Sequence, residues 1–188
     1  QGRVQGQIDI GLNDEGRAQA ELLASALAAE PITAIYSSDL SRARATAEAL
    51  GRATGVALQL DAGLRERHFG AFQARTVEEV ERDHPELARR WRSREVDFAP
   101  DGGETLTEFF DRCVTTATLI ASRHPGQTVA LVTHGGVLDC LYRAANGMAL
   151  EAPRSWHLGN ASINRLLFTD QGLTIIGWGD SAHLSANT

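Results

Sequence analysis

The hydrophobic positions of the chain follow two periods, which predicts strands that alternate with helices. Short apolar and β-branched runs at 34–37, 56–60 and 128–132 are typical of buried strands. Amphipathic helical spacing is found at 13–31, 41–55, 76–84, 85–92, 105–120 and 135–147, and a hairpin is indicated at 163–168 and 173–176. This order predicts an α/β domain with a largely parallel sheet, the antiparallel pair lying at or near an edge.

Polar residues at several predicted helix starts support these boundaries. Asn13 is a typical N-cap, because its side chain can accept a hydrogen bond from a free backbone N–H group. Thr76 with Glu79, and Thr105 with Glu108, have the spacing of a capping box. We therefore expect two further helices to begin directly after Thr76 and Thr105.

The composition is that of one globular domain over residues 1–188. With 188 residues, 43% of them hydrophobic and 22% charged, the chain can bury a sizeable core. No apolar run approaches membrane-spanning length, and the first residues are unlike a signal peptide. Cys113 and Cys140 lie in separate helical patterns without CxxC spacing, so we expect no disulfide and a reducing, cytoplasmic setting.

The charged residues narrow the chemistry. A net charge of −6 argues against nucleic acid or an anionic membrane as a partner. All 18 basic residues are arginine, and without lysine the chain has neither Schiff-base chemistry nor a Walker A phosphate loop. No motif has metal-ligand spacing, so no metal site is expected. Any phosphate is therefore held by arginine, histidine and backbone groups.

The most informative stretch runs from Thr128 to Leu138, where a buried strand leads into His134, two glycines and a new helix. Gly135 lets the backbone approach a ligand, and the free N–H groups of the helix favour an anion beside the imidazole. Arg42 and Glu66 follow two other predicted strands, and ligand groups collect at the carboxyl ends of strands in such folds. An arginine fork, a histidine and a protonated carboxyl group can together bind phosphate and protonate a leaving group.

Each of these side chains also has an ordinary structural interpretation. His134 could be a turn histidine bonded to the backbone, and Arg42 a solvated residue on a helix surface. Glu66 could pair with Arg65 or Arg67 in a loop. These alternatives stay open for each residue alone, whereas the three residues together favour a phosphate site.

Six segments carry a family resemblance over nearly the whole chain. They are Gly2–Leu12, Gly16–Ala20, Ser37–Ala47, Leu64–Gly70, Gly102–Thr105 and Val132–Gly135. In this order they resemble the histidine phosphatase superfamily, in its phosphoglycerate-mutase-like branch. The resemblance implies a three-layer α/β/α sandwich with a mostly parallel, mixed central sheet.

The resemblance also implies a role for individual residues. By this likeness His134 orients the phosphoryl group, Arg42 clamps the phosphate and Glu66 donates and accepts the proton. Gln5 and Gly6 occupy positions that line the substrate side. A candidate substrate wall is formed by Arg67, Phe69, Trp91 and His183.

The nucleophile of this family, the histidine of an Arg-His-Gly-Glu motif at the end of the first strand, is absent from the chain. None of the six histidines replaces it by motif, since His68 belongs to the Glu66 loop, and His84 and His124 precede prolines. We expect that the natural protein carries this strand and motif, roughly ten to fifteen further residues, given a strand of about five or six. The strand would be a central one in the sheet.

Three functions are compatible with the resemblance. The first is a metal-independent phosphomonoesterase that hydrolyses a small phosphorylated metabolite through a phosphohistidine, without a cofactor. The second is a phosphoglycerate mutase dependent on 2,3-bisphosphoglycerate, which ranks lower because the lysine and adjacent arginine pair that grip a carboxylate in such mutases are not matched. The third is a non-catalytic phosphate-binding module, which gives Glu66 no role. An exposed edge strand or apolar helix face is a candidate surface for a homodimer.

Overall fold

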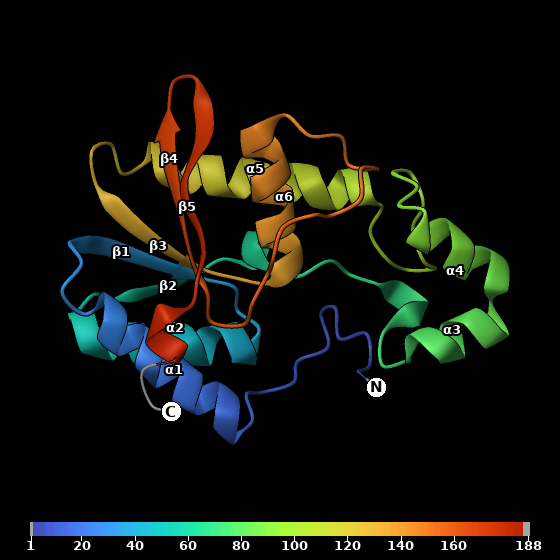
Figure 1. Cartoon of the computed structure of the whole chain (residues 1–188), viewed down its shortest axis with the longest axis horizontal. Helices are drawn as coiled ribbons and strands as arrows, with labels where there is room; N and C mark the ends of the chain where they lie inside the picture. Colours follow the sequence, from blue (N-terminus) through green and yellow to red (C-terminus); the bar gives the residue numbers. More distant parts are fainter. Residues whose placement is uncertain (1, 186–188) are drawn as a thin grey trace.

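The fold, described for residues 2–185 by a computed structural model, combines a parallel sheet, covering helices and a separate hairpin (Figure 1). In chain order the elements are α1 (Asp14–Leu27), β1 (Ile32–Ser37), α2 (Ser41–Thr54), β2 (Leu58–Leu60), η1 (Ala62–Leu64), η2 (Gly70–Phe72), α3 (Val77–Asp83), α4 (Pro85–Arg92), α5 (Leu106–Ser122), β3 (Thr128–Val132), α6 (Gly135–Asn146), β4 (Ile163–Thr169), β5 (Gly172–Asp180) and η3 (Ala182–Leu184). Within these described residues, no helix combines the length and the apolar character needed to cross a membrane.

The predicted helix starts are confirmed. The Asn13 side chain accepts a hydrogen bond from the Gly16 N–H, and both predicted capping boxes, at Thr76 and Thr105, are complete. One predicted boundary was wrong: α1 ends at Leu27, well before Pro31. Sequence patterns fix where a helix starts better than where it ends, since a side-chain cap marks the start.

The three parallel strands lie in the order β2-β1-β3 and divide two layers of helices. On one face Ile35 packs with Ala47 and Leu50 of α2. On the other face Tyr36 packs with Ile120 of α5. Neighbouring strand residues thus point into opposite cores, as the period of a strand requires, and the predicted three-layer α/β/α arrangement is confirmed.

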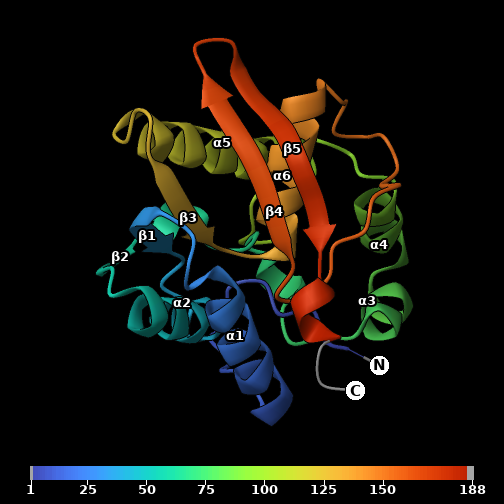
Figure 2. The same cartoon turned by 60° about the vertical axis from the view of Figure 1, so that its left-hand side comes forward.

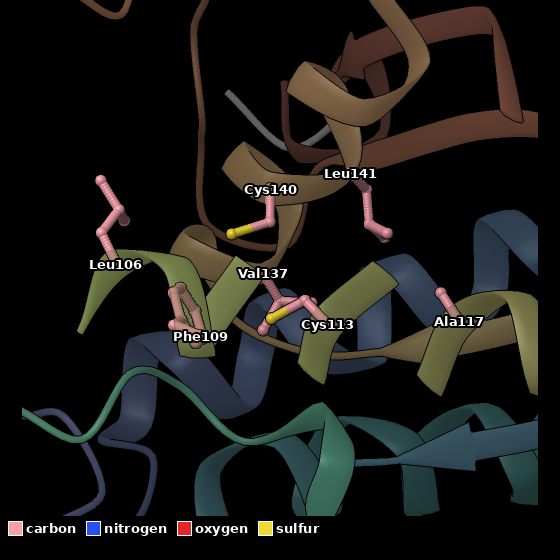
Figure 3. Packing of buried hydrophobic residues seen from close by; sticks show 7 residues of the cluster. All are labelled: Leu106, Phe109, Cys113, Ala117, Val137, Cys140 and Leu141. Atoms are coloured by element: carbon pink, nitrogen blue, oxygen red, sulfur yellow. The ribbon is translucent and has the colours of Figure 1, made fainter. Parts of the chain in front are cut away.

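A second core fixes α6 against α5 and with it the turn that carries His134. Its buried residues, shown in Figure 3, are Leu106, Phe109, Cys113, Ala117, Val137, Cys140 and Leu141. Both cysteines are free and buried in this cluster. A hydrogen bond with Cys140, together with burial, raises the pKa of the Cys113 thiol far above its ordinary value. The Cys113 thiol is a packing group, because the reactive form of cysteine is the thiolate.

The hairpin differs from the prediction in its place. Strands β4 and β5 pair antiparallel as expected, but they form a sheet of their own and are not hydrogen-bonded to the parallel sheet (Figure 2). A groove of about 1170 Å³ lies between the hairpin and the parallel sheet, and it is lined by all of β3 and by residues 163–167 of β4. The edges of β3 and β4 that face the groove therefore have no backbone hydrogen-bond partner among residues 2–185.

Candidate active site

The carboxyl ends of the parallel strands bring the three predicted side chains together. Arg42 lies in the first turn of α2 after β1, Glu66 follows β2, and His134 follows β3 as the N-cap residue of α6. All three line one end of the same groove, together with Gln5, Gly6, Phe69 and Gly135. A parallel sheet positions such groups at one edge because all of its strands end there.

Glu66 is fixed by two backbone N–H groups. Its Oε1 atom accepts from the Arg67 N–H at 2.8 Å, and its Oε2 atom accepts from the Gly136 N–H at 3.0 Å. Burial raises the pKa of Glu66, against the lowering effect of these two hydrogen bonds and of the Arg42 and Arg112 charges. A carboxyl group with a raised pKa keeps its proton longer, as a general acid requires.

Gly136, in the first turn of α6, lies directly against the Glu66 carboxyl group. A Cβ atom at position 136 would lie only 2.1 Å from Glu66 Oε1. Glycine at this position therefore allows the backbone of α6 to approach the Glu66 side chain closely. The His-Gly-Gly sequence pointed to the ligand side of this turn, whereas its second glycine contacts Glu66.

An arginine and a second glutamate hold the loop that carries Glu66. Arg112 of α5 donates to the backbone carbonyls of Gly63 and Arg65 at 2.9 and 3.0 Å, and makes two 2.8 Å hydrogen bonds to Glu104. Glu104 in turn accepts from the His68 N–H at 2.8 Å. Neither Arg112 nor Glu104 was singled out in the sequence, although Glu104 lies in the Gly102–Thr105 segment of the family resemblance.

The ion-pair interpretation of Glu66 is wrong. Arg65 pairs instead with Asp39, through contacts of 2.6 and 2.5 Å. Arg67 donates to the backbone carbonyls of Phe98 and Glu104. Glu66 itself forms no ion pair within residues 2–185.

His134 is buried and its ring lies 2.9 Å from the Ser38 hydroxyl, measured from Nε2 to Oγ. Burial, helped by the Arg42 and Arg112 charges, lowers the pKa of His134 to about 3. The imidazole is thus neutral near pH 7 and has one N–H donor and one acceptor nitrogen. Its partner is a side chain and not the backbone that the turn-histidine interpretation required; Ser38 lies in the Ser37–Ala47 segment but was not singled out.

Arg42 binds the opening loop of the chain. It donates to the Gly6 carbonyl at 2.7 Å and to the Ile8 carbonyl at 2.9 Å. Gly6 has a positive φ of 54°, and a Cβ atom there would lie 2.3 Å from Gln73 Oε1, so glycine is needed. Arg42 is half-buried, which excludes the solvated-surface interpretation, and it brings Gln5 and Gly6 to the groove.

The candidate wall residues divide into two groups. Arg67, Phe69 and Trp91 line a cavity of about 220 Å³ that also touches Glu66 and Gly136. His183 lines neither this cavity nor the groove; its Nε2 atom lies 2.9 Å from the Ala161 carbonyl oxygen. The geometry thus gives support to three of the four wall residues and none to His183.

Comparison with known proteins identifies a family for the chain. The model of the histidine phosphatase superfamily (branch 1) matches residues 1–181. The chain belongs to this superfamily. The expected resemblance is confirmed. Arg42 and His134, which lie in two of the segments that carry it, both line the groove.

Relatives within the superfamily carry the names of phosphatases and mutase-like proteins. The chain is 38% identical over 186 residues to "Phosphoglycerate mutase-like protein 4" of Arabidopsis thaliana, covering 97% of this chain and 80% of that one. It is 36% identical over 189 residues to the "Metal-independent phosphoserine phosphatase" of the same plant, covering 98% and 77%.

A solved structure of the superfamily has the same fold. The native mycobacterial glucosyl-3-phosphoglycerate phosphatase superposes with a TM-score of 0.82 at 32% sequence identity, covering 95% of this chain and 92% of that chain. The predicted phosphoglycerate-mutase-like architecture is thereby confirmed.

Proposed function

We propose that this histidine phosphatase hydrolyses the phosphate monoester of a small metabolite, without a metal, through a phosphohistidine. The observation that carries the proposal is the position and environment of the Glu66 carboxyl group. Its carboxyl group has a raised pKa and lies between the groove and the 220 Å³ cavity, where it can protonate the alkoxide of a departing alcohol. The names of two relatives, a phosphoserine phosphatase and a glucosyl-3-phosphoglycerate phosphatase, support a small phosphorylated substrate.

The proposed reaction has two phosphoryl transfers. A histidine attacks phosphorus, the bond to the alcohol oxygen breaks, and Glu66 gives its proton to that oxygen. Water then attacks the phosphohistidine and gives a proton back to Glu66, which releases phosphate and restores the enzyme. Arg42 and the neutral His134 stabilise the charge on the transferring group by donating hydrogen bonds to its oxygens.

We also propose that the attacking histidine belongs to a β-strand of the natural protein that lies in the groove. The unpaired edges of β3 and β4 support this, since an extended segment between them would satisfy the backbone groups of both. The carboxyl end of a strand parallel to β3 would then lie beside Arg42 and His134. Among residues 2–185 no other histidine lines the groove.

A direct assay tests the function. The natural full-length protein is given p-nitrophenyl phosphate or 3-phosphoglycerate in the presence of EDTA, and phosphate release is measured. We expect turnover that falls about 10²–10⁴-fold in Glu66→Gln, because the general acid is lost, and that also falls in His134→Ala. The exposed Glu151→Gln is the matched control for the glutamate substitution and keeps full activity.

Other outcomes would replace the proposal. Conversion of 3- to 2-phosphoglycerate that depends on 2,3-bisphosphoglycerate, without phosphate release, would establish the mutase function suggested by the mutase-like relative. Phosphate binding without either reaction would indicate a binding module. An acid-labile, alkali-stable phosphoenzyme, trapped from labelled substrate, would identify the phosphohistidine directly.

A further inference from the structure

The hydrogen bond behind His134 decides which of its two ring nitrogens carries the proton. Ser38, directly after β1, is completely buried and does not line the groove, whereas His134 does. The two side chains meet at 2.9 Å, between Ser38 Oγ and His134 Nε2. In a neutral imidazole one nitrogen donates and the other accepts, so the direction of this one hydrogen bond fixes the role of both.

The other polar groups of Ser38 already have partners. Its N–H group donates to the Val132 carbonyl at 3.0 Å, and its carbonyl accepts from the Ser37 hydroxyl at 2.8 Å. The hydroxyl oxygen itself accepts from the Leu40 N–H at 3.3 Å. Among residues 2–185, His134 Nε2 is the only other hydrogen-bond partner of this oxygen, so it is the only acceptor for the hydroxyl proton.

The hydroxyl proton gives the direction of the bond between Ser38 and His134. If Nε2 carried the ring proton, it would donate to Oγ, and the buried hydroxyl proton would have no acceptor among the described residues. A buried donor without a partner is unfavourable. If Nε2 is unprotonated, the hydroxyl donates to it and every polar group of Ser38 is satisfied. The proton of the neutral ring then lies on Nδ1.

The Nδ1 atom of His134 is the ring nitrogen that a ligand can reach. It forms no hydrogen bond within residues 2–185, yet it is not one of the three buried side-chain atoms that lack a partner there. It therefore keeps some exposed surface, and the void that His134 lines is the groove. A proton on Nδ1 is thus available to an oxygen of a ligand in the groove.

We propose that Ser38 is a positioning residue that holds His134 as the neutral Nδ1–H tautomer, with this N–H group directed at the phosphoryl oxygens. The inference rests on the proposed function, in which His134 donates a hydrogen bond to the transferring group. A donor that is oriented before the reaction stabilises the developing charge without reorganisation. The opposite tautomer would present a lone pair to the same oxygens and repel them.

The same arrangement excludes His134 as the attacking histidine. Attack on phosphorus requires the free lone pair of a ring nitrogen. The lone pair of Nε2 accepts the Ser38 proton, and Nδ1 has no free lone pair while it is protonated. His134 therefore acts only as a donor, and the phosphohistidine forms on the other histidine proposed above.

Nitrogen NMR of the full-length protein tests the tautomer without turnover. Histidine is labelled with nitrogen-15, and near neutral pH the correlations between ring nitrogens and carbon-bound ring protons distinguish protonated from unprotonated nitrogens. The His134 signals are those that disappear in His134→Gln. We expect a protonated Nδ1 and an unprotonated Nε2. A protonated Nε2, or equal populations of the two tautomers, would overturn the proposal.

Substitution of the serine tests its positioning role. In Ser38→Ala we expect a mixture of tautomers in the spectrum. We also expect kcat for p-nitrophenyl phosphate to fall by about 10- to 100-fold, because removing such a donor outright costs roughly 10²–10³-fold. Ser37→Ala is the matched control, since it removes a neighbouring buried hydroxyl that bonds to the Ser38 carbonyl and not to His134. It should leave the spectrum and kcat unchanged.

The outcomes separate this proposal from the proposed function. In the His134→Ala background Ser38→Ala should cost little more, because the serine acts through the ring. An equal loss in both backgrounds, or an unchanged kcat in Ser38→Ala alone, would refute the positioning role and leave the phosphatase intact. If the protein turns over no phosphate ester, or if Ser38→Ala does not fold, the spectrum of the unaltered protein still decides the tautomer.

Discussion

The substitution Gly136→Ala tests the position of the Glu66 side chain separately from the rest of the site, because the atoms nearest to the added methyl group all belong to Glu66. The added methyl group would lie 2.1 Å from Glu66 Oε1, 2.9 Å from its Cδ and 3.1 Å from its Oε2. Because these three atoms all belong to the Glu66 side chain, it is this side chain that has to move. Reaching ordinary contact at 3.4 Å requires Oε1 to shift by about 1.3 Å.

The expected effects on activity and stability have opposite signs. Misplacing a reacting group by about 1 Å can cost on the order of 10²-fold in rate, so we expect kcat to fall by about that factor. Alanine in a helix is more favourable than glycine by roughly 0.5–1 kcal/mol, which offsets the displaced side chain. The melting temperature should therefore stay within a few degrees while most activity is lost.

A double-mutant comparison shows whether the loss passes through Glu66. Gly136→Ala is measured alone and combined with Glu66→Gln, with phosphate release from p-nitrophenyl phosphate as the assay. If the alanine acts by displacing the carboxyl group, it costs little more in the Glu66→Gln background. Full activity of Gly136→Ala, or an equal loss in both backgrounds, would refute the reasoning. Gly135→Ala, where a Cβ atom meets no protein atom within 4 Å, reports separately on the phosphate side.

Three further predictions concern stability. Because burial raises the pKa of Glu66 above its usual 4.5, the folded state holds this proton more tightly than the unfolded chain. The free energy of unfolding should therefore fall as the pH rises from 4.5 through the raised pKa of Glu66. In Glu66→Gln this pH dependence, measured by urea unfolding at a series of pH values, should be lost. The pKa of His134 is lowered from 6.5 to about 3, so the folded state loses stability as the pH falls below 6.5, by up to about 1.4 kcal/mol per pH unit; His134→Gln should flatten the urea midpoint between pH 6.5 and 4, and an unchanged slope would contradict a neutral buried ring. Thr105→Ala breaks a complete capping box and should lower the unfolding free energy by about 1 kcal/mol with kcat unchanged, whereas Thr105→Ser should restore it.

The sequence was sufficient for the features that depend on neighbouring residues. The capping boxes at Thr76 and Thr105 were predicted because a side chain three residues away satisfies the free N–H groups. The strand that ends before His134 was predicted because five apolar or β-branched residues in a row are typical of a strand in a parallel sheet. The convergence of Arg42, Glu66 and His134 was expected because parallel strands all end at one edge of a sheet.

Distances between remote segments could not be predicted. Nothing in the local pattern shows that Glu66 rests on Gly136, that Arg65 pairs with Asp39, or that Ser38 faces His134, since each contact joins segments far apart in the chain.

What the sequence by itself determined, then, is the order of the elements, the edge of the sheet at which the chemistry gathers and the superfamily. The tertiary structure decided which groups surround each ionisable side chain. These surroundings raise the pKa of Glu66 and lower the pKa of His134 and of Arg67. The physical reason is that desolvation and charge interactions depend on distance in space, and only the packing of helices on the sheet fixes those distances.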